Sequence, residues 1–345
     1  MLRARNSLKA FVAYGRNSQI FFDQAEQAMH IFKLDEIRRA IDPFALIKSQ
    51  EAGFVAYTEG KAVVPPVGYL HFGDPPGDCH IKYGYIKDDD YFVVKIATGF
   101  YRNADLGRPV GNGMMVLFSQ TTGSLETLLL DEGYLTDMRT AAAGAVAAKY
   151  LAPKTIDRIG IIGTGVQARL QLKMLKYVTD CREACVWGRD PKKSEQIKTD
   201  LSSEFSLEAI SRIEELANTC NLIVTTTAAR EPLVYSSDIK SGTHITAVGA
   251  DAPGKQELDP QIFKKAQRVV VDSVSQCVDH GDVSHAVRAG LIDDEELTEL
   301  GEVVKNPGLG RRSEEEITVA DLTGVAVQDI EIAKLVHRIL RDNTR

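Results

Sequence analysis

Short apolar runs alternate with longer, partly polar stretches through the second half of the chain. The runs comprise residues 157–162, 183–188, 221–226, 243–249 and 267–272. Strands of a parallel sheet are apolar throughout because helices cover both faces, and each crossover between strands is long enough for a helix. The pattern therefore predicts an α/β fold with a doubly wound parallel sheet in this half.

The first half of the chain has a different pattern. Residues 23–40 carry apolar side chains at helical spacing, whereas residues 92–97 and 113–119 are strand-like runs separated by loops rich in glycine and proline. We expect a smaller α+β domain here, whose sheet contributes to a substrate site.

Two further helices are predicted near the domain boundaries. Residues 134–152 are rich in alanine, with Thr136 or Asp137 as the cap and Pro153 as the stop. Residues 325–341 have helical apolar spacing and no strand left to join, so we expect this tail to pack on the first half. The predicted domains are a substrate-binding and dimerisation domain, residues 1–130 plus 320–345, and a dinucleotide-binding domain, residues 131–319.

A glycine-rich turn follows the first apolar run of the second half. Gly163 and Gly165 permit a sharp turn and close approach of a phosphate, and Ala168 is small enough for the next helix to pack on the strand. The free N–H groups and the dipole of that helix favour an anion. The spacing predicts a Rossmann-type dinucleotide-binding domain, with Val166 and Gln167 lining the pyrophosphate site.

The end of the second apolar run bears on the choice of cofactor. Gly188 stands where NAD-preferring proteins carry an acidic residue, and the adjacent Arg189 could neutralise a 2′-phosphate. Asp190 could still accept a hydrogen bond from a 2′-hydroxyl. We therefore expect NAD(P)(H), with NADP(H) favoured over NAD(H). Further cofactor contacts are expected at Thr226, Val248 and Lys255.

Composition limits the classes of protein that fit. The hydrophobic fraction of 44% suits a globular chain, and a net charge of −7 without a dense Lys/Arg run argues against nucleic-acid or membrane partners. The five cysteines lack a Cys-x-x-Cys pair, so we expect reduced thiols and no metal. There is no apolar run of about 18 residues, and we expect a cytoplasmic protein. His280 and His285 are expected on the surface.

Five motifs, in order along the chain, resemble the ornithine cyclodeaminase and mu-crystallin family. They are residues 93–97 around Lys95, residues 135–143 around Arg139, the Gly163/Gly165 turn, residues 249–258 around Asp251, and residues 323–329. The resemblance covers most of the chain. It implies an NAD- or NADP-dependent enzyme that moves a hydride at a carbon bearing an amino or imino nitrogen. It also implies a small amino-acid or imino-acid substrate and a homodimer.

The same resemblance implies roles for particular residues. Lys95 is in an apolar strand, where a desolvated ammonium can act as an acid or base and contact the substrate. Arg139 presents a planar fork suited to the substrate carboxylate. Asp251 follows a strand at the carboxyl edge of the sheet, where it would handle protons. Thr323 is expected at the substrate. The structural alternatives are a solvent-facing lysine, a surface arginine and a turn-forming aspartate.

One departure from the family pattern concerns the substrate carboxylate. Many members carry a Pro-x-Arg motif in the first domain, but residues 64–69 contain no arginine, and none occurs between Arg39 and Arg102. His80 or Lys82 is a candidate replacement. Lys82 would bring a point charge instead of a fork, and an exposed lysine is the alternative.

The motifs leave the reaction open. In the favoured hypothesis the protein is an ornithine cyclodeaminase: the carboxylate binds Arg139 and Lys95, hydride transfer produces an iminium, the δ-amine adds to it, and L-proline and ammonia are released. A ketimine reductase or an alanine-dehydrogenase-type oxidoreductase would use the same site. A hypothesis of another class is a non-catalytic NADPH and small-ligand binder of the mu-crystallin type.

Overall fold

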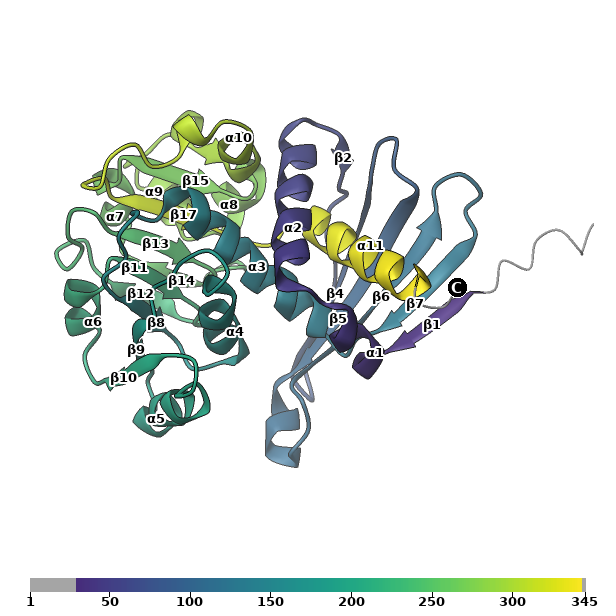
Figure 1. Cartoon of the computed structure of the whole chain (residues 1–345), viewed down its shortest axis with the longest axis horizontal. Helices are drawn as coiled ribbons and strands as arrows, with labels where there is room; N and C mark the ends of the chain where they lie inside the picture. Colours follow the sequence, from purple (N-terminus) through teal and green to yellow (C-terminus); the bar gives the residue numbers. More distant parts are fainter. Residues whose placement is uncertain (1–28, 343–345) are drawn as a thin grey trace, which may run out of the picture.

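The computed structural model describes residues 29–342. Two lobes lie side by side, one built on a seven-stranded sheet and the other on an eight-stranded sheet (Figure 1). The eight-stranded sheet is parallel throughout, whereas the seven-stranded sheet is mainly antiparallel. This arrangement confirms the predicted α/β class and its two-domain architecture. No helix of residues 29–342 has the length and apolar character needed to span a membrane.

The first lobe has strand order β1-β7-β6-β5-β4-β2, and β3 pairs with β4. Its strands are β1 (His30–Lys33), β2 (Ala62–Val63), β3 (Gly68–Phe72), β4 (Gly77–Ile86), β5 (Tyr91–Phe100), β6 (Gly111–Ser119) and β7 (Leu125–Leu130). The predicted strands at 92–97 and 113–119 are therefore confirmed as parts of β5 and β6.

The prediction of one helix over residues 23–40 is wrong for residues 30–33. Residues 30–33 form β1, which pairs in parallel with β7, and only Leu34–Ala40 is helical, as α1. Phe32 is buried while Ile31 and Lys33 are exposed, which is the alternation of a strand. Phe32 fits the helical spacing of apolar residues as well, but it is buried because β1 pairs with the edge of β7. Residues 23–28 lie outside the described residues.

The two faces of the first sheet differ. Helix α11 (Ala326–Asp342) covers one face (Figure 1). On the other face, five apolar side chains follow one another in register across the strands: Ile31, Leu128, Val116, Val94 and Tyr83. Ile31 and Tyr83 are 49% and 41% exposed, so this row, which we call the open apolar row, remains accessible at both ends.

The second lobe has strand order β10-β9-β8-β11-β13-β17-β15-β16. Its strands are β8 (Ile159–Ile162), β9 (Glu183–Trp187), β10 (Ser206–Ile210), β11 (Leu222–Thr225), β13 (His244–Ala247), β15 (Arg268–Val271), β16 (Thr298–Glu299) and β17 (Thr318–Asp321). The order reverses between β8 and β11, which makes their carboxyl ends the expected ligand site. All five predicted runs are strands, whereas β10, β16 and β17 were not predicted.

Short helices surround this sheet. They are α4 (Val166–Leu175), α5 (Pro191–Asp200), α6 (Ile213–Thr219), α7 (Gln261–Lys265), α8 (Val274–His280), α9 (Val283–Arg288) and α10 (Leu300–Lys305). A small sheet of β12 (Arg230–Val234) and β14 (Gln256–Leu258) lies beside it.

Helix α3 (Tyr134–Leu151) is the predicted alanine-rich helix, and it packs against α2 (Pro43–Thr58), α4 and α11. Its cap differs from the prediction. Gly133, with φ of 86°, precedes the helix, and Thr136 and Asp137 lie inside its first turns. The carboxylate of Asp131 accepts a hydrogen bond from the Leu135 N–H at 2.8 Å, so an upstream residue takes the capping role.

The chain returns to the first lobe after β17. All four residues of Thr318–Asp321 pair with β13 and β15, so the boundary expected at 319 cuts a strand of the second sheet. The return crossing therefore lies between Asp321 and Ala326. The predicted C-terminal helix is confirmed as α11, which packs on β4, β5 and β6 as expected.

Candidate functional site

The glycine turn after β8 has the geometry that a dinucleotide needs. Gly163 has φ of 126°, and a Cβ on it would lie 2.4 Å from the Thr226 hydroxyl, so only glycine fits. Its N–H donates to the Trp187 carbonyl at 2.9 Å, which ties the turn to the end of β9. Thr226 donates from its hydroxyl to the Ile162 carbonyl at 3.2 Å. The predicted residues Gly163 and Thr226 thus lie together at the switch point.

Helix α4 begins with its backbone open. Gly165 is its N-cap residue, and a Cβ placed there would meet no atom within 4 Å of its position among the described residues. Val166 is 54% exposed, whereas Ala168 is fully buried against the sheet. The first N–H groups of α4 therefore face accessible space, and this bare backbone fits a pyrophosphate.

Gln167 connects the glycine turn to α3. Its side-chain amide donates to the carbonyl of Asp137 at 3.1 Å and to the Asp137 carboxylate at 3.2 Å. Asp137 lies two residues before Arg139 on α3, so these hydrogen bonds join the nucleotide turn to the helix that carries Arg139. The Gln167 side chain thus holds protein elements together, and only its backbone remains beside the predicted pyrophosphate site.

The residues after β9 lie beside the glycine turn. Gly188 is buried, and a Cβ there would lie 2.3 Å from the methyl group of Thr164. Arg189 and Asp190 are exposed. The Asp190 carboxylate caps α5 by accepting from the Lys192 N–H at 3.0 Å. Asp190 is therefore partly committed to the fold, while the Arg189 side chain is on the surface.

A buried ion-pair cluster lies where the lobes meet. The ammonium of Lys95, on β5, lies 2.8 Å from one carboxylate oxygen of Asp329 on α11, and Nε of Arg139, on α3, lies 3.1 Å from the other. Arg139 also donates from Nη1 to the side-chain carbonyl of Gln328 at 3.1 Å. Lys95 is 2% exposed and Arg139 6%. The solvent-facing alternatives for both residues are thereby excluded.

Burial and charge shift the acid–base properties of this cluster. Desolvation lowers the pKa of Lys95 to about 7, although the nearby carboxylate of Asp329 opposes the shift. Desolvation acts to raise the pKa of Asp329, but Lys95 and Arg139 hold it below its ordinary value. Burial raises the pKa of the nearby Asp131 to about 6. Lys95 can therefore gain or lose a proton near neutral pH.

Lys82 lies beside this cluster. It is the register partner of Lys95 across β4 and β5, and both side chains are on the α11 face of the sheet. Its ammonium donates to the Gly324 carbonyl at 2.6 Å, and desolvation lowers its pKa. The structure thus brings Lys82, Lys95 and Arg139 together, as predicted. His80, the other candidate, is half-buried two residues away.

The return crossing is held by Asp272, which follows β15. Its carboxylate accepts hydrogen bonds from the Thr323 hydroxyl at 3.1 Å and from the Gly324 N–H at 2.6 Å. Gln276 donates to the Thr323 hydroxyl at 2.9 Å. The Thr323 hydroxyl therefore already donates to one protein group and accepts from another, and it shapes the loop that touches Lys82.

Asp251 lies apart from the buried cluster. It is on the loop after β13, with a side chain 54% exposed, and it pairs with Lys255 at 2.6 Å. Its negative charge opposes the lowering of the pKa of His80 and of Lys82 by desolvation, so its carboxylate is near both side chains. Val248 is buried and donates from its N–H to the Thr225 carbonyl at 3.0 Å. Asp251, expected to handle protons, and Lys255, expected at the cofactor, thus pair with each other outside the buried cluster.

Two functional candidates were missed at the sequence level. Asp329 belongs to the motif of residues 323–329, yet its pairing depends on three segments far apart in sequence. The available signal was an acidic residue on the inward face of the C-terminal helix. The second candidate is Glu257, within the motif of residues 249–258. Its buried carboxylate accepts from the Thr225 hydroxyl at 2.7 Å and from the Gly249 N–H at 2.8 Å. It thereby fixes the loops that follow β11 and β13.

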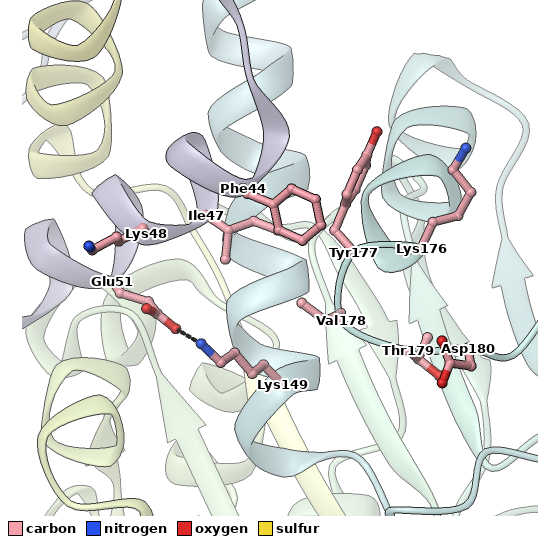
Figure 2. Close-up of a pocket in the computed structure, with 10 residues that line it drawn as sticks. All are labelled: Phe44, Ile47, Lys48, Glu51, Lys149, Lys176, Tyr177, Val178, Thr179 and Asp180. Carbon is pink, nitrogen blue, oxygen red and sulfur yellow. Dashed lines mark hydrogen bonds and ion pairs between the residues drawn. The ribbon is translucent and has the colours of Figure 1, made fainter.

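Two cavities accompany these elements. One, of about 590 Å³, lies between α2, α3 and the loop after α4, where Phe44 and Tyr177 face each other and Glu51 pairs with Lys149 (Figure 2). It contains none of the predicted site residues. The second, of about 570 Å³, is lined by Lys82 and lies between the lobes. His280 lines it with a side chain 17% exposed, so the residue expected on the surface lies partly buried in the wall of this cavity. Residues 29–342 contain no group of three or more His, Cys, Asp or Glu side chains that could hold a metal ion.

Sequence comparison agrees with the arrangement of these motifs. The ornithine cyclodeaminase/mu-crystallin family matches over residues 26–344. The chain belongs to this family. An uncharacterized cyclodeaminase of Sinorhizobium fredii is 43% identical over 316 residues, covering 90% of this chain and 95% of the relative. An iminosuccinate reductase of Paracoccus denitrificans is 34% identical over 310 residues, covering 89% of this chain and 95% of the relative.

Solved structures of family members have the same fold. An archaeal alanine dehydrogenase dimer with bound NAD is 36% identical, with a TM-score of 0.84 and coverage of 92% of this chain and 97% of that one. The Δ1-pyrroline-2-carboxylate reductase of Thermococcus litoralis, in complex with NADH and L-proline, is 30% identical, with a TM-score of 0.86 and coverage of 92% and 98%. These ligands support a nicotinamide cofactor for the family site described above.

Proposed function

We propose that this protein is an NAD(P)-dependent oxidoreductase that interconverts a small amino acid and its imino or oxo acid. The observation that carries the proposal is the buried Lys95–Asp329–Arg139 cluster. It combines a cation suited to a carboxylate with an ammonium that titrates near neutral pH. The cofactor, held at the Gly163–Gly165 turn, supplies or accepts the hydride.

The residues of the cluster have distinct tasks in this proposal. Arg139 binds the α-carboxylate, because Asp329 and Gln328 occupy Nε and Nη1 and leave Nη2 without a hydrogen bond to the described residues. In the reductive direction, protonated Lys95 donates a proton to the substrate nitrogen as the α-carbon receives the hydride. In the oxidative direction, neutral Lys95 accepts that proton, and water replaces the imino nitrogen to yield an oxo acid and ammonia.

The charges beside the site favour this reaction over cyclodeamination of a diamine. Lys82, Lys95 and Arg139 crowd one region, and Asp329 is the carboxylate that pairs directly with two of them. A substrate side chain that ends in an ammonium would add a fourth cation, which like-charge repulsion disfavours.

Ornithine cyclodeamination is the second candidate. It is favoured by Asp251, whose carboxylate is accessible outside the buried cluster and could accept a proton from the δ-amine. The non-catalytic alternative is disfavoured because a ligand binder has no need of a lysine whose pKa is lowered to about 7.

The choice of cofactor rests on Gly188 and Arg189. No carboxylate at position 188 repels a 2′-phosphate, and the exposed Arg189 side chain is free to approach one. NADP(H) is therefore the proposed cofactor, with NAD(H) as the alternative.

A homodimer is the proposed assembly. The open apolar row crosses five strands of the first sheet, and an accessible apolar sheet face favours association with another surface. The alanine dehydrogenase described above, of the same fold, is a dimer. A second copy of the chain is accordingly proposed to cover this face.

The proposal is tested by a panel of amino acids assayed with NAD+ and NADP+, measuring reduced cofactor by absorbance and ammonia separately. Formation of reduced cofactor together with ammonia supports the oxidoreductase. Release of proline and ammonia from ornithine without net cofactor reduction supports the cyclodeaminase. Tight cofactor binding without turnover of any substrate would leave the binding protein as the better description.

A further inference from the structure

The cavity beside Lys82 has two unlike walls. Pro65, Pro66 and Val67 form an apolar wall on the first lobe, whereas Lys82, Gln276 and His280 present polar groups. Val67 is 41% exposed. Its volume of about 570 Å³ falls within the range of about 300–1,000 Å³ found for small-molecule sites. The cavity is therefore large enough for a substrate side chain with a polar end.

Lys82 has unused binding capacity toward this space. Its ammonium has three N–H groups, of which one donates to the Gly324 carbonyl. Lys95 and Arg139 share Asp329, but Lys82 forms no ion pair within the part of the chain described. The carboxylates of Asp329, Asp251 and Asp272 act on Lys82 only from beyond ion-pair distance. A partly buried ammonium with two N–H groups left over therefore favours an anionic ligand group there.

Other carboxylates near this cation already have partners. Asp272 accepts hydrogen bonds from Thr323 and Gly324, and Asp251 pairs with Lys255. Asp279, on the cavity rim, is 75% exposed and bonded to His280 at 3.0 Å. None of these three carboxylates forms an ion pair with Lys82, so its ammonium remains available to a ligand in the cavity.

Gly324 sets the spacing between Lys82 and Arg139. Its carbonyl accepts from Lys82, and a Cβ on it would lie 2.7 Å from Nη1 of Arg139. One residue spans at most about 3.6 Å along the chain. The two cations on either side of Gly324 are therefore close enough to bind both ends of a short diacid.

We infer, building on the proposed function, that the substrate is a short dicarboxylic amino or imino acid. Its α-carboxylate binds Arg139, and its second carboxylate enters the cavity and pairs with Lys82. The apolar wall of Pro65, Pro66 and Val67 contacts the methylene groups between them. The cavity is thus a specificity pocket for an acidic side chain.

The test compares diacids with neutral amino acids in the wild-type enzyme and in Lys82→Met. We expect kcat/KM for L-aspartate or L-glutamate to exceed that for L-alanine and L-proline, and Lys82→Met to lower it by about 100-fold, as loss of a buried ionic partner does. The loss of kcat/KM with L-alanine should be much smaller than the loss with the diacids, so the readout is the ratio of the two, which loss of a contact shared by all substrates would leave unchanged. Lys82→Arg should retain part of the diacid activity, and Lys87→Met, an exposed lysine just after the same strand, serves as the control.

A measurement on the wild type keeps the test independent of variant folding. Succinate should compete with the amino-acid substrate at far lower concentration than propionate does. Preference for L-alanine or L-proline over both diacids, or equal loss of all substrates in Lys82→Met, would overturn the inference and leave the proposed oxidoreductase intact. Absence of turnover with every amino acid, despite cofactor binding, would instead overturn the proposed function.

Discussion

The Asp329 carboxylate lies 2.8 Å from the Lys95 ammonium, with both groups almost fully buried. Asp329 also binds Arg139, so one carboxylate orients the two cations proposed to act on the substrate. It is therefore a positioning residue, because it acts through these two side chains.

Replacing Asp329 with Asn should lower kcat/KM and move its pH dependence. Asp329 raises the pKa of Lys95, so loss of its charge should shift the Lys95 midpoint to lower pH. Breaking a buried pair also costs about 3–5 kcal/mol of stability. Rates measured across pH, with a thermal melt of each variant, separate these effects.

Glu331→Gln is the matched control for Asp329→Asn. Glu331 is buried on the same helix but pairs with Lys334. Its replacement should leave the midpoint unchanged, and Asp329→Glu should restore part of the activity. A loss of activity in Asp329→Asn with an unmoved midpoint would reduce Asp329 to a structural role.

The pH dependence of the wild type should follow Lys95. Its pKa in the folded protein is lowered to about 7, so the ammonium is present below that pH and neutral above it. Reductive kcat/KM should therefore fall as pH rises through about 7, whereas oxidative kcat/KM should rise. Lys95→Ala should abolish both activities while cofactor affinity, measured by fluorescence titration, stays near the wild-type value. A fully active variant would contradict the assignment.

The lowered pKa of Lys95 should also make the stability of the protein depend on pH. A lysine whose folded pKa lies below its unfolded value binds fewer protons when folded, so stability should rise with pH between about 7 and about 10.4. In Lys95→Met this contribution should be absent. Urea denaturation of both proteins at several pH values within that window measures the difference. Parallel curves for the two proteins would argue against the lowered pKa.

Alanine substitutions at the two glycines of the nucleotide turn should have different effects on stability and on cofactor binding. Gly163→Ala places a Cβ 2.4 Å from the Thr226 hydroxyl at a φ of 126°, so it should lower the melting temperature of the protein without ligand. Gly165→Ala meets no described atom within 4 Å and should leave that temperature unchanged. It should instead weaken cofactor binding by blocking close approach of the phosphates. Normal cofactor affinity in Gly165→Ala would show that the pyrophosphate does not bind at this position.

Arg189→Ala tests the cofactor preference. Loss of a guanidinium that contacts a 2′-phosphate should weaken NADP(H) binding by about tenfold or more, with little change for NAD(H). Lys193→Ala, an exposed cation nearby on α5, is the control. Calorimetric titration with both cofactors gives the affinities. Unchanged NADP(H) affinity in Arg189→Ala would exclude a phosphate contact by this residue.

The open apolar row can be tested by introducing a charge. Tyr83→Glu should convert the protein from dimer to monomer, because an unpaired carboxylate would be buried at the interface. Tyr235→Glu changes a similarly exposed tyrosine, 50% accessible, on the other lobe and should have no effect. Analytical ultracentrifugation at several concentrations distinguishes the outcomes. A Tyr83→Glu dimer as tight as the wild type would place the interface elsewhere.

The extent to which sequence predicted this site follows from how local each signal is. The Gly163 turn needs only neighbouring residues, so its spacing was sufficient. Lys95 and Arg139 were found because each belongs to a recognisable motif. Their partner Asp329 was missed, since the pairing joins a strand, an inner helix and the C-terminal helix. Residues 30–33 were misjudged for the same reason: only the distant β7 edge makes them a strand.

Gly324 connects these observations. Its carbonyl accepts a hydrogen bond from Lys82, and its lack of a side chain makes room for the guanidinium of Arg139. The position of Lys82 thus depends on a peptide carbonyl, whereas the side chains of Asp329 and Gln328 hold Arg139. On the proposed function, a substitution in the cavity wall, for instance at Val67, would change which molecules are processed while the cations that hold the substrate stay in place.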